Sequence, residues 1–174
     1  MMRRSYALVM SLALLLATPG IGLAAPFERP AGNQKYVEYV IARALSQRGV
    51  PFTYGGDAVK GPNRGIAPTA PAPTTVSDPA SNVVGFDASG LIVYAFAGAG
   101  VKMPRSSGEQ YKVGEKVAPA QALPGDLIFY GPEGTESVAL FIGNGQMVQG
   151  TEPVVTVSPV RTEGMTPYFV RIIA

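Results

Sequence analysis

The feature that most constrains the fold is a change in the pattern of apolar residues about halfway along the chain. In the first half, apolar residues recur at helical spacing over residues 35–48 and fill residues 91–99, which predicts two helices. In the second half, short apolar runs alternate with glycine turns, and Asn144-Gly145 is a strong hairpin signal. Helices followed by a series of strands indicate an α+β domain with an antiparallel sheet. The predicted strands cover residues 126–130, 137–142, 146–149, 154–157 and 168–173.

We interpret residues 1–25 as a signal peptide. Arg3 and Arg4 give a basic start, residues 6–17 form an apolar core that is short for a membrane span, and Gly22-Leu23-Ala24 offers a cleavage site. An uncleaved anchor is the alternative, and the arginine pair fits both general secretory and twin-arginine export. The segment predicts a secreted protein with no membrane span after cleavage.

The rest of the chain is predicted to form one domain. Residues 26–34 are a short polar lead, and the domain covers residues 35–174. Asn33 is the expected N-cap of the first helix, and Gly49 is expected to end it. Residues 57–84 are rich in proline, glycine, alanine and threonine and show no apolar period, so we expect a surface loop inserted between the two helices.

The composition excludes several kinds of site. The chain contains no cysteine and no histidine, so it has no disulfide, no thiolate nucleophile, no imidazole base and no zinc site of the cysteine or histidine type. The aspartates show no close spacing of the calcium-loop kind, and we predict neither a metal nor a cofactor. Removing residues 1–25 takes away two arginines and leaves 12 basic against 12 acidic residues. This near-zero net charge gives no support for nucleic-acid binding.

The stretch GFDASGLIVYAF at residues 85–96 has the form of a turn that enters a buried helix. Hydrolases often keep a nucleophile in such a position, because backbone N–H groups at a helix start stabilise an anion. Here the central residue is Ala88, which has no reactive group. Asp87 fits an N-cap, and Ser89 as a substitute nucleophile would need a base that the chain does not supply as histidine.

In order along the chain, six motifs resemble those of the NlpC/P60 family of cell-wall cysteine peptidases. That family's pattern runs PYxWGG, DCSGL, LPR-S with a nearby Gln, PGDL, HVGIYIG and an MIHA-like strand. The resemblance implies a papain-like α+β fold, with helices packed on a central antiparallel sheet, and a location in the cell wall. The matching stretches are PFTYGG (residues 51–56), DASGL (87–91), MPRS (103–106) with Gln110, PGDL (124–127), SVALFIG (137–143) and MVQ (147–149).

The departures from the family pattern bear on function. The family's nucleophilic cysteine falls on Ala88, its base histidine on Ser137 and its third polar residue on Gln149, while Phe52 replaces a tyrosine. The resemblance therefore implies a natural pseudoenzyme that binds the stem peptide of peptidoglycan without cleaving it. The alternative function is a regulator or docking partner of active cell-wall hydrolases.

The candidate ligand-binding residues come from the same motifs, and each has a structural alternative. Arg105 either grips a carboxylate of the stem peptide or serves as an internal ion-pair partner. Gln149 either donates to a ligand or is a hydrogen-bonded strand residue, and Tyr54 either borders the groove or packs in the core. The full set is Asp87, Ser89, Arg105, Tyr54, Ser137 and Gln149.

Overall fold

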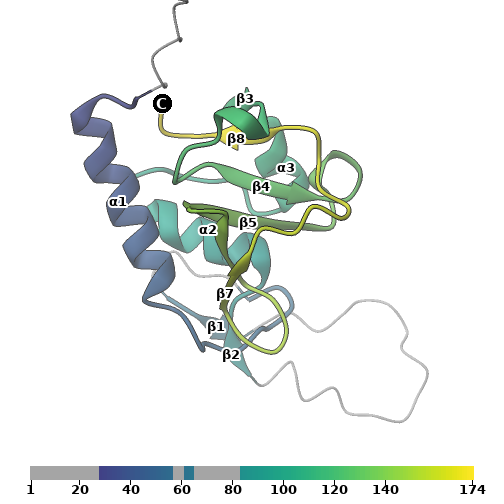
Figure 1. Ribbon diagram of the computed structural model, residues 1–174. Helices are drawn as coiled ribbons and strands as arrows, with labels where there is room; N and C mark the ends of the chain where they lie inside the picture. The colour runs from purple at the N-terminus through teal and green to yellow at the C-terminus, as the bar shows by residue number, and fades with distance from the viewer. Residues whose placement is uncertain (1–27, 57–60, 65–82) are drawn as a thin grey trace, which may run out of the picture.

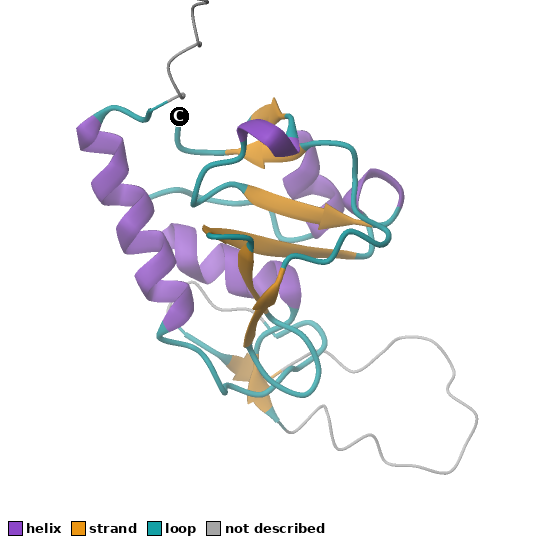
Figure 2. Ribbon diagram, viewed as in Figure 1, coloured by secondary structure: helices purple, strands orange, loops and turns teal. Residues whose placement is uncertain are grey.

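The computed structural model describes residues 28–56, 61–64 and 83–174 of the chain. The predicted signal peptide, residues 26–27 of the lead segment and most of the predicted 57–84 loop lie outside these residues. The described part of the chain has an α+β architecture with an antiparallel sheet, as the sequence predicts (Figures 1 and 2). The large sheet has six strands, whereas the sequence predicts five. No helix in this part of the chain has the length and apolar character needed to cross a membrane.

The helices lie mainly before the large sheet in the chain. They are α1 (Ala31–Leu45), α2 (Ala88–Ala97) and α3 (Ser107–Lys112), with two 3₁₀ turns, η2 (Pro119–Gln121) and η3 (Pro132–Gly134). Two very short strands, β1 (Asn63–Arg64) and β2 (Val84–Gly85), pair with each other next to the start of α2. The large sheet has the order β3-β8-β4-β5-β6-β7. Its strands are β3 (Glu115–Val117), β4 (Leu127–Tyr130), β5 (Ser137–Gly143), β6 (Gln146–Gln149), β7 (Thr156–Pro159) and β8 (Phe169–Arg171).

The main core lies between the helices and one face of the sheet. α1 packs on α2, and α2 packs against β5 (Figure 1). Alternate residues of a strand point to opposite faces, so Leu127 and Phe129 of β4 face this core together with Leu140 of β5. All three side chains are fully buried, which fixes the register of the two strands against the helices.

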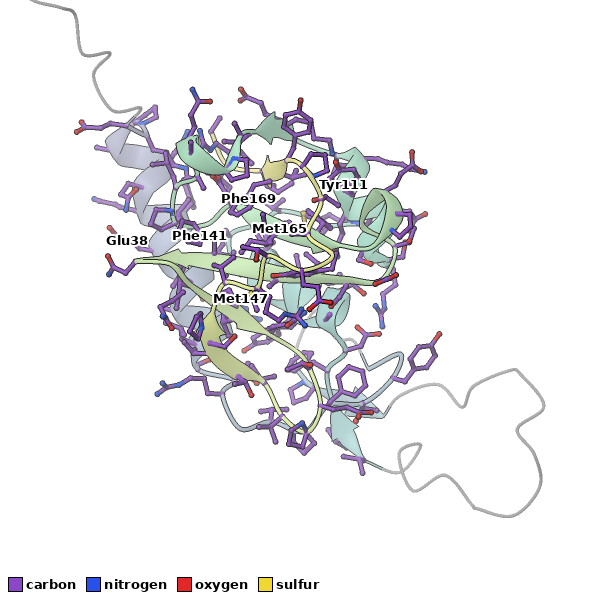
Figure 3. All side chains as sticks on the ribbon, turned by 45° about the vertical axis from the view of Figure 1, so that its right-hand side comes forward. Glu38, Tyr111, Phe141, Met147, Met165 and Phe169 are labelled. Atoms are coloured by element: carbon purple, nitrogen blue, oxygen red, sulfur yellow. The ribbon has the colours of Figure 1, made fainter. Side chains whose placement is uncertain are left out.

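A second, smaller cluster covers the opposite face of the sheet. Phe141, Met147, Met165 and Phe169 gather there, and the rings of Phe141 and Phe169 meet edge to face at 5.9 Å between centroids (Figure 3). Met165 belongs to the connection that leads into β8 rather than to a strand. Both faces of β4 are therefore covered, which explains its continuous apolar run LIFY.

Several element boundaries differ from the prediction. α1 starts at Ala31 rather than Lys35, and Pro30 occupies the N-cap position, so the predicted Asn33 cap is wrong. Alanine, glycine and asparagine in the first turn carry no apolar period, which hid the true start. Asn33 instead donates from its amide to the backbone of Ala174, holding the chain end beside α1. The fourth and fifth predicted strands also shift, to Thr156–Pro159 and Phe169–Arg171.

Candidate functional site

A cavity of about 640 Å³ lies where the start of α2 meets the start of β5. Its size falls in the usual range for small-ligand sites. The loop after β6 and the segment after Phe52 complete its wall, and we call it the groove. It is lined by Phe52, Tyr54, Gly55, Asp87, Ala88, Ser89, Arg105, Ser106, Ser107, Thr135, Glu136, Ser137, Gly150, Thr151 and Glu152.

The start of α2 forms the floor of the groove. Asp87 is the N-cap residue, and its Oδ1 accepts a hydrogen bond from the Gly90 N–H at 2.7 Å. Its Oδ2 accepts from the Gly55 N–H at 3.0 Å, which ties the segment before β1 to the helix. Ala88 is the first residue of the helix and presents only a methyl group to the groove. The predicted cap is confirmed, and it orients the helix start toward the cavity.

Arg105 is bound to the same helix start. Its two terminal nitrogens donate to the two carboxylate oxygens of Asp87, at 3.1 and 2.8 Å. One of them also donates to Ser89 Oγ at 2.8 Å. The fork geometry of guanidinium and carboxylate is thus used inside the protein, which corresponds to the internal ion-pair alternative for Arg105. Ser89 is only 9% exposed and its hydroxyl accepts from a cation, which opposes its use as a nucleophile.

Ser137 and Gln149 form a second polar pair on the sheet side of the groove. Gln149 Nε2 donates to Ser137 Oγ at 2.7 Å, and Gln149 Oε1 accepts from Arg161 at 3.2 Å. Gln149 is only 4% exposed and lies behind Ser137 rather than in the groove lining. Because the Ser137 oxygen accepts from Gln149, its own O–H is directed elsewhere and is available to a ligand.

Arg161 is held in place by Tyr130. The guanidinium carbon lies 4.3 Å from the centre of the tyrosine ring, a cation–π contact, and the tyrosine O–H donates to the Arg161 carbonyl at 3.2 Å. Burial raises the pKa of the Tyr130 phenol above its ordinary value, and the positive charge of Arg161 partly opposes this. Sequence reasoning missed Arg161 because nothing in its local pattern links it to residue 149.

The other side of the groove is formed by the loop after β6. A Cβ on Gly150 would lie 2.7 Å from the carbonyl oxygen of Asp87, so only glycine allows this loop to approach the helix start so closely. Thr151 and Glu152 then follow along the groove. Tyr54 also lines the groove and is 61% exposed, so the alternative that it packs in the core is wrong.

The structure thus brings five of the six predicted ligand-binding residues into one lining and places Gln149 directly behind it. Two acidic residues of the lining, Glu136 and Glu152, were missed. Glu136 immediately precedes the SVALFIG motif, so its proximity to Ser137 was a usable signal. Within the described residues no group of three or more acidic side chains gathers as a metal site.

Comparison with known proteins identifies the family that has this fold. The sequence profile of the NlpC/P60 family matches residues 49–174, which is most of the chain. The chain belongs to the NlpC/P60 family. The α+β fold with helices against an antiparallel sheet is the fold of its solved family neighbours, so the predicted fold and family are confirmed.

Curated NlpC/P60 relatives include two peptidoglycan endopeptidases of Mycobacterium tuberculosis H37Rv. RipB is 52% identical over 145 residues, which is 82% of this chain and 56% of RipB. RipA is 48% identical over 138 residues, which is 78% of this chain and 27% of RipA. The chain therefore spans about half or less of the length of these relatives.

Solved structures extend the comparison. RipD from Mycobacterium tuberculosis, described as a non-catalytic NlpC/P60 domain protein adapted to peptidoglycan binding, is 60% identical with a TM-score of 0.69, and the match covers 79% of this chain and 97% of the RipD chain. The P60 domain of an antigen from M. avium paratuberculosis is 56% identical with a TM-score of 0.72, covering 80% of this chain and 95% of that domain. NlpC/P60 proteins similar to this chain thus include both endopeptidases and a non-catalytic binder.

Proposed function

We propose that this chain is a secreted, non-catalytic NlpC/P60 protein that binds the stem peptide of cell-wall peptidoglycan in the groove. The observation that carries the proposal is Ala88 at the start of α2. A helix N-terminus opens into a ligand-sized cavity there, but the residue on it has no reactive atom. The groove is suited to hold a peptide and lacks the group that would attack it.

The remaining polar residues of the groove support binding rather than hydrolysis. A cysteine peptidase needs a thiolate and a base that assists it. In this family pattern those positions hold Ala88 and Ser137, and the whole chain contains neither cysteine nor histidine. The position that would orient a histidine holds Gln149, which orients the Ser137 hydroxyl instead.

RipD, RipA and RipB support the assignment to peptidoglycan. RipD is described as non-catalytic and peptidoglycan-binding, whereas RipA and RipB are named peptidoglycan endopeptidases. Since all three are at least 48% identical to this chain, the choice between the two functions depends on the groove residues rather than on overall similarity. Those residues favour the binding function.

Co-sedimentation with purified insoluble peptidoglycan tests the proposal. We expect the chain to sediment with it and to release no new peptide detectable by mass spectrometry. Ala88→Trp should reduce sedimentation, because the indole would fill the floor of the groove. Ala120→Trp is the matched control, since Ala120 is exposed in η2 and lies outside the groove lining.

Three results would count against the proposal. Cleavage that disappears in Ser89→Ala would show that the chain is an enzyme. If both tryptophan variants lost sedimentation equally, the loss would not be specific to the groove, and the groove would not be the binding site. A chain that does not sediment, but captures an active cell-wall hydrolase in a pull-down, would be the regulator considered as the alternative.

A further inference from the structure

The ionisable side chains of the groove carry an excess of negative charge. Its lining contains three carboxylates, on Asp87, Glu136 and Glu152, and one cationic group, the guanidinium of Arg105. The Arg105 guanidinium already faces Asp87, at 2.8 Å in the salt bridge. Within the described chain neither Glu136 nor Glu152 has a salt-bridge partner. These two carboxylates are therefore the charges that the groove presents to a ligand.

Glu136 is positioned by the turn between β4 and β5. Its backbone N–H donates to the Tyr130 carbonyl at 3.0 Å, which fixes the residue directly before Ser137. Its side chain crosses Gly131, where a Cβ would lie 2.6 Å from the carboxyl carbon of Glu136. Gly131 also has a φ of 79°, a conformation that other residues rarely adopt. The turn thus positions the Glu136 side chain against Gly131 at the edge of the groove.

Glu152 reaches the groove from the neighbouring strand. β5 and β6 are antiparallel, and Gln149 at the end of β6 lies beside Ser137 at the start of β5. The residues before Ser137 and after Gln149 therefore emerge at the same end of this strand pair. Gly150 anchors the loop against the carbonyl of Asp87, and Glu152 follows two residues later. Glu136 and Glu152 thus lie at the same end of the groove.

We infer that the groove selects a stem peptide by a free amino group, through Glu136 and Glu152, rather than by a carboxylate. This inference rests on the proposed function and names the ligand chemistry of the same site. An ammonium group is attracted by two unpaired carboxylates, whereas a peptide carboxylate would be repelled by them and would have to compete with Asp87 for Arg105. The Ser137 O–H adds a donor that suits a peptide carbonyl.

The chemical consequence concerns cross-linking. A stem peptide that contains a diamino acid has a free side-chain amine until a cross-link converts that amine to a neutral amide. A groove that favours the ammonium group therefore binds a stem peptide with a free side-chain amine more tightly than one cross-linked through that amine. The free amine and its amide form supply the two arms of a direct test.

The test uses calorimetric titration of the mature chain with two soluble stem peptides, both acetylated at the N-terminus. One keeps the free side-chain amine of diaminopimelate, and the other is acetylated there as well. We expect the second to bind more weakly by up to about fivefold, the upper end of the range for exposed ion pairs. The double variant Glu136→Gln/Glu152→Gln should bind the two peptides equally. Glu163→Gln is the control, because Glu163 is exposed and lies outside the groove lining.

Salt gives a second readout of the same contact. The preference for the free amine should shrink at high ionic strength, because exposed charges are screened over roughly 3 Å at 1 M salt. Equal affinity for the two peptides, with sedimentation on peptidoglycan intact, would overturn the inference and leave the proposed function standing. If the double variant still preferred the free-amine peptide, residues other than Glu136 and Glu152 would cause the preference. Absence of binding in every assay would overturn both.

Discussion

Two Arg–Asp constellations in this molecule use the same chemistry in opposite environments. In the first, Asp126 lies between Arg29 and Arg171, and all three side chains are between 0% and 4% exposed. In the second, Asp87 pairs with Arg105 at the groove, and these side chains are 16% and 36% exposed. The salt-bridge distances are nearly equal, at 2.7 Å in the buried group and 2.8 Å in the groove.

The buried group connects distant parts of the chain. Arg29 precedes α1 and also donates to backbone carbonyls of Pro124 and Ile173, while Arg171 of β8 donates to both oxygens of Asp126. Burial lowers the pKa of the Arg29 guanidinium, and the charge of Asp126 only partly reverses this. Two almost fully buried cations share one anion, so removal of the aspartate charge is expected to be costly.

The comparison shows that burial distinguishes an ion pair that stabilises the fold from an ion pair that lines the groove. The buried group joins the residues before α1 to the last strand, so we expect it to act on stability. The groove pair is partly hydrated, so its effect on stability is small. The pair affects the charge of the groove instead, because Asp87 neutralises Arg105, the only cationic side chain in the described lining.

The same substitution at the two aspartates gives the largest expected difference. Asp126→Asn keeps the shape but removes the carboxylate charge that two buried guanidinium groups share, which should lower the free energy of unfolding by about 3–5 kcal/mol. Asp87→Asn keeps an N-cap, since asparagine caps as well as aspartate, and should cost only about 0.5–1 kcal/mol. Urea unfolding followed by circular dichroism measures both.

A third variant tests this comparison. Arg29→Met removes one of the two cations and leaves a neutral Arg171–Asp126 pair, so its cost should lie between those of the two asparagine variants. If Asp87→Asn were as destabilising as Asp126→Asn, the distinction between a structural pair and a groove pair would be wrong.

The sequence predicts the architecture well, because it depends on apolar periodicity and on turn residues. It predicts the shorter elements poorly. α3 was missed because its six residues carry no apolar period, although Ser106 and Glu109 form the capping box that marks its start. β3 has three residues and was missed for the same reason. Short elements are fixed by packing and pairing partners, which a local pattern does not contain.

For the site, motif order places Asp87, Ala88 and Ser137 around one cavity, but it does not describe what their neighbours do. The partner of Arg105 comes from 18 positions earlier in the chain, and Arg161 reaches Gln149 across 12 positions. The buried group is more distant still, since Arg29 and Asp126 are 97 positions apart. Each of these contacts depends on the tertiary fold, so residue type alone left the role of Arg105 open.

An intermediate effect is expected from Arg105→Met. Stability should fall by no more than about 1 kcal/mol, because the pair is partly exposed. The released Asp87 carboxylate should make the groove more negative and raise the affinity for the free-amine stem peptide by about twofold to threefold. Lys102→Met is the matched control, since it removes one positive charge from an exposed side chain outside the groove lining.

The sign of the Arg105 result is informative. If Arg105→Met weakens binding of the free-amine peptide, while Lys102→Met does not, then Arg105 contacts the ligand as the carboxylate-gripping alternative supposed. In that case the groove pair is a ligand-binding pair that opens on binding, and the contrast with the buried group becomes larger.

The smallest expected effect is that of pH on binding. Both ion pairs are built from residue types whose reference pKa values lie below about 5 or above about 10, and the chain has no histidine or cysteine to titrate between them. With the N-terminally acetylated peptide, affinity at constant ionic strength should therefore change by less than about twofold between roughly pH 5.5 and 7.5. Calorimetric titration at several pH values measures this. A tenfold change would correspond to about 1.4 kcal/mol and would require a groove carboxylate that binds a proton in this window. The double variant Glu136→Gln/Glu152→Gln would then show whether that proton resides on the two glutamates, and Asp87→Asn whether it resides in the ion pair.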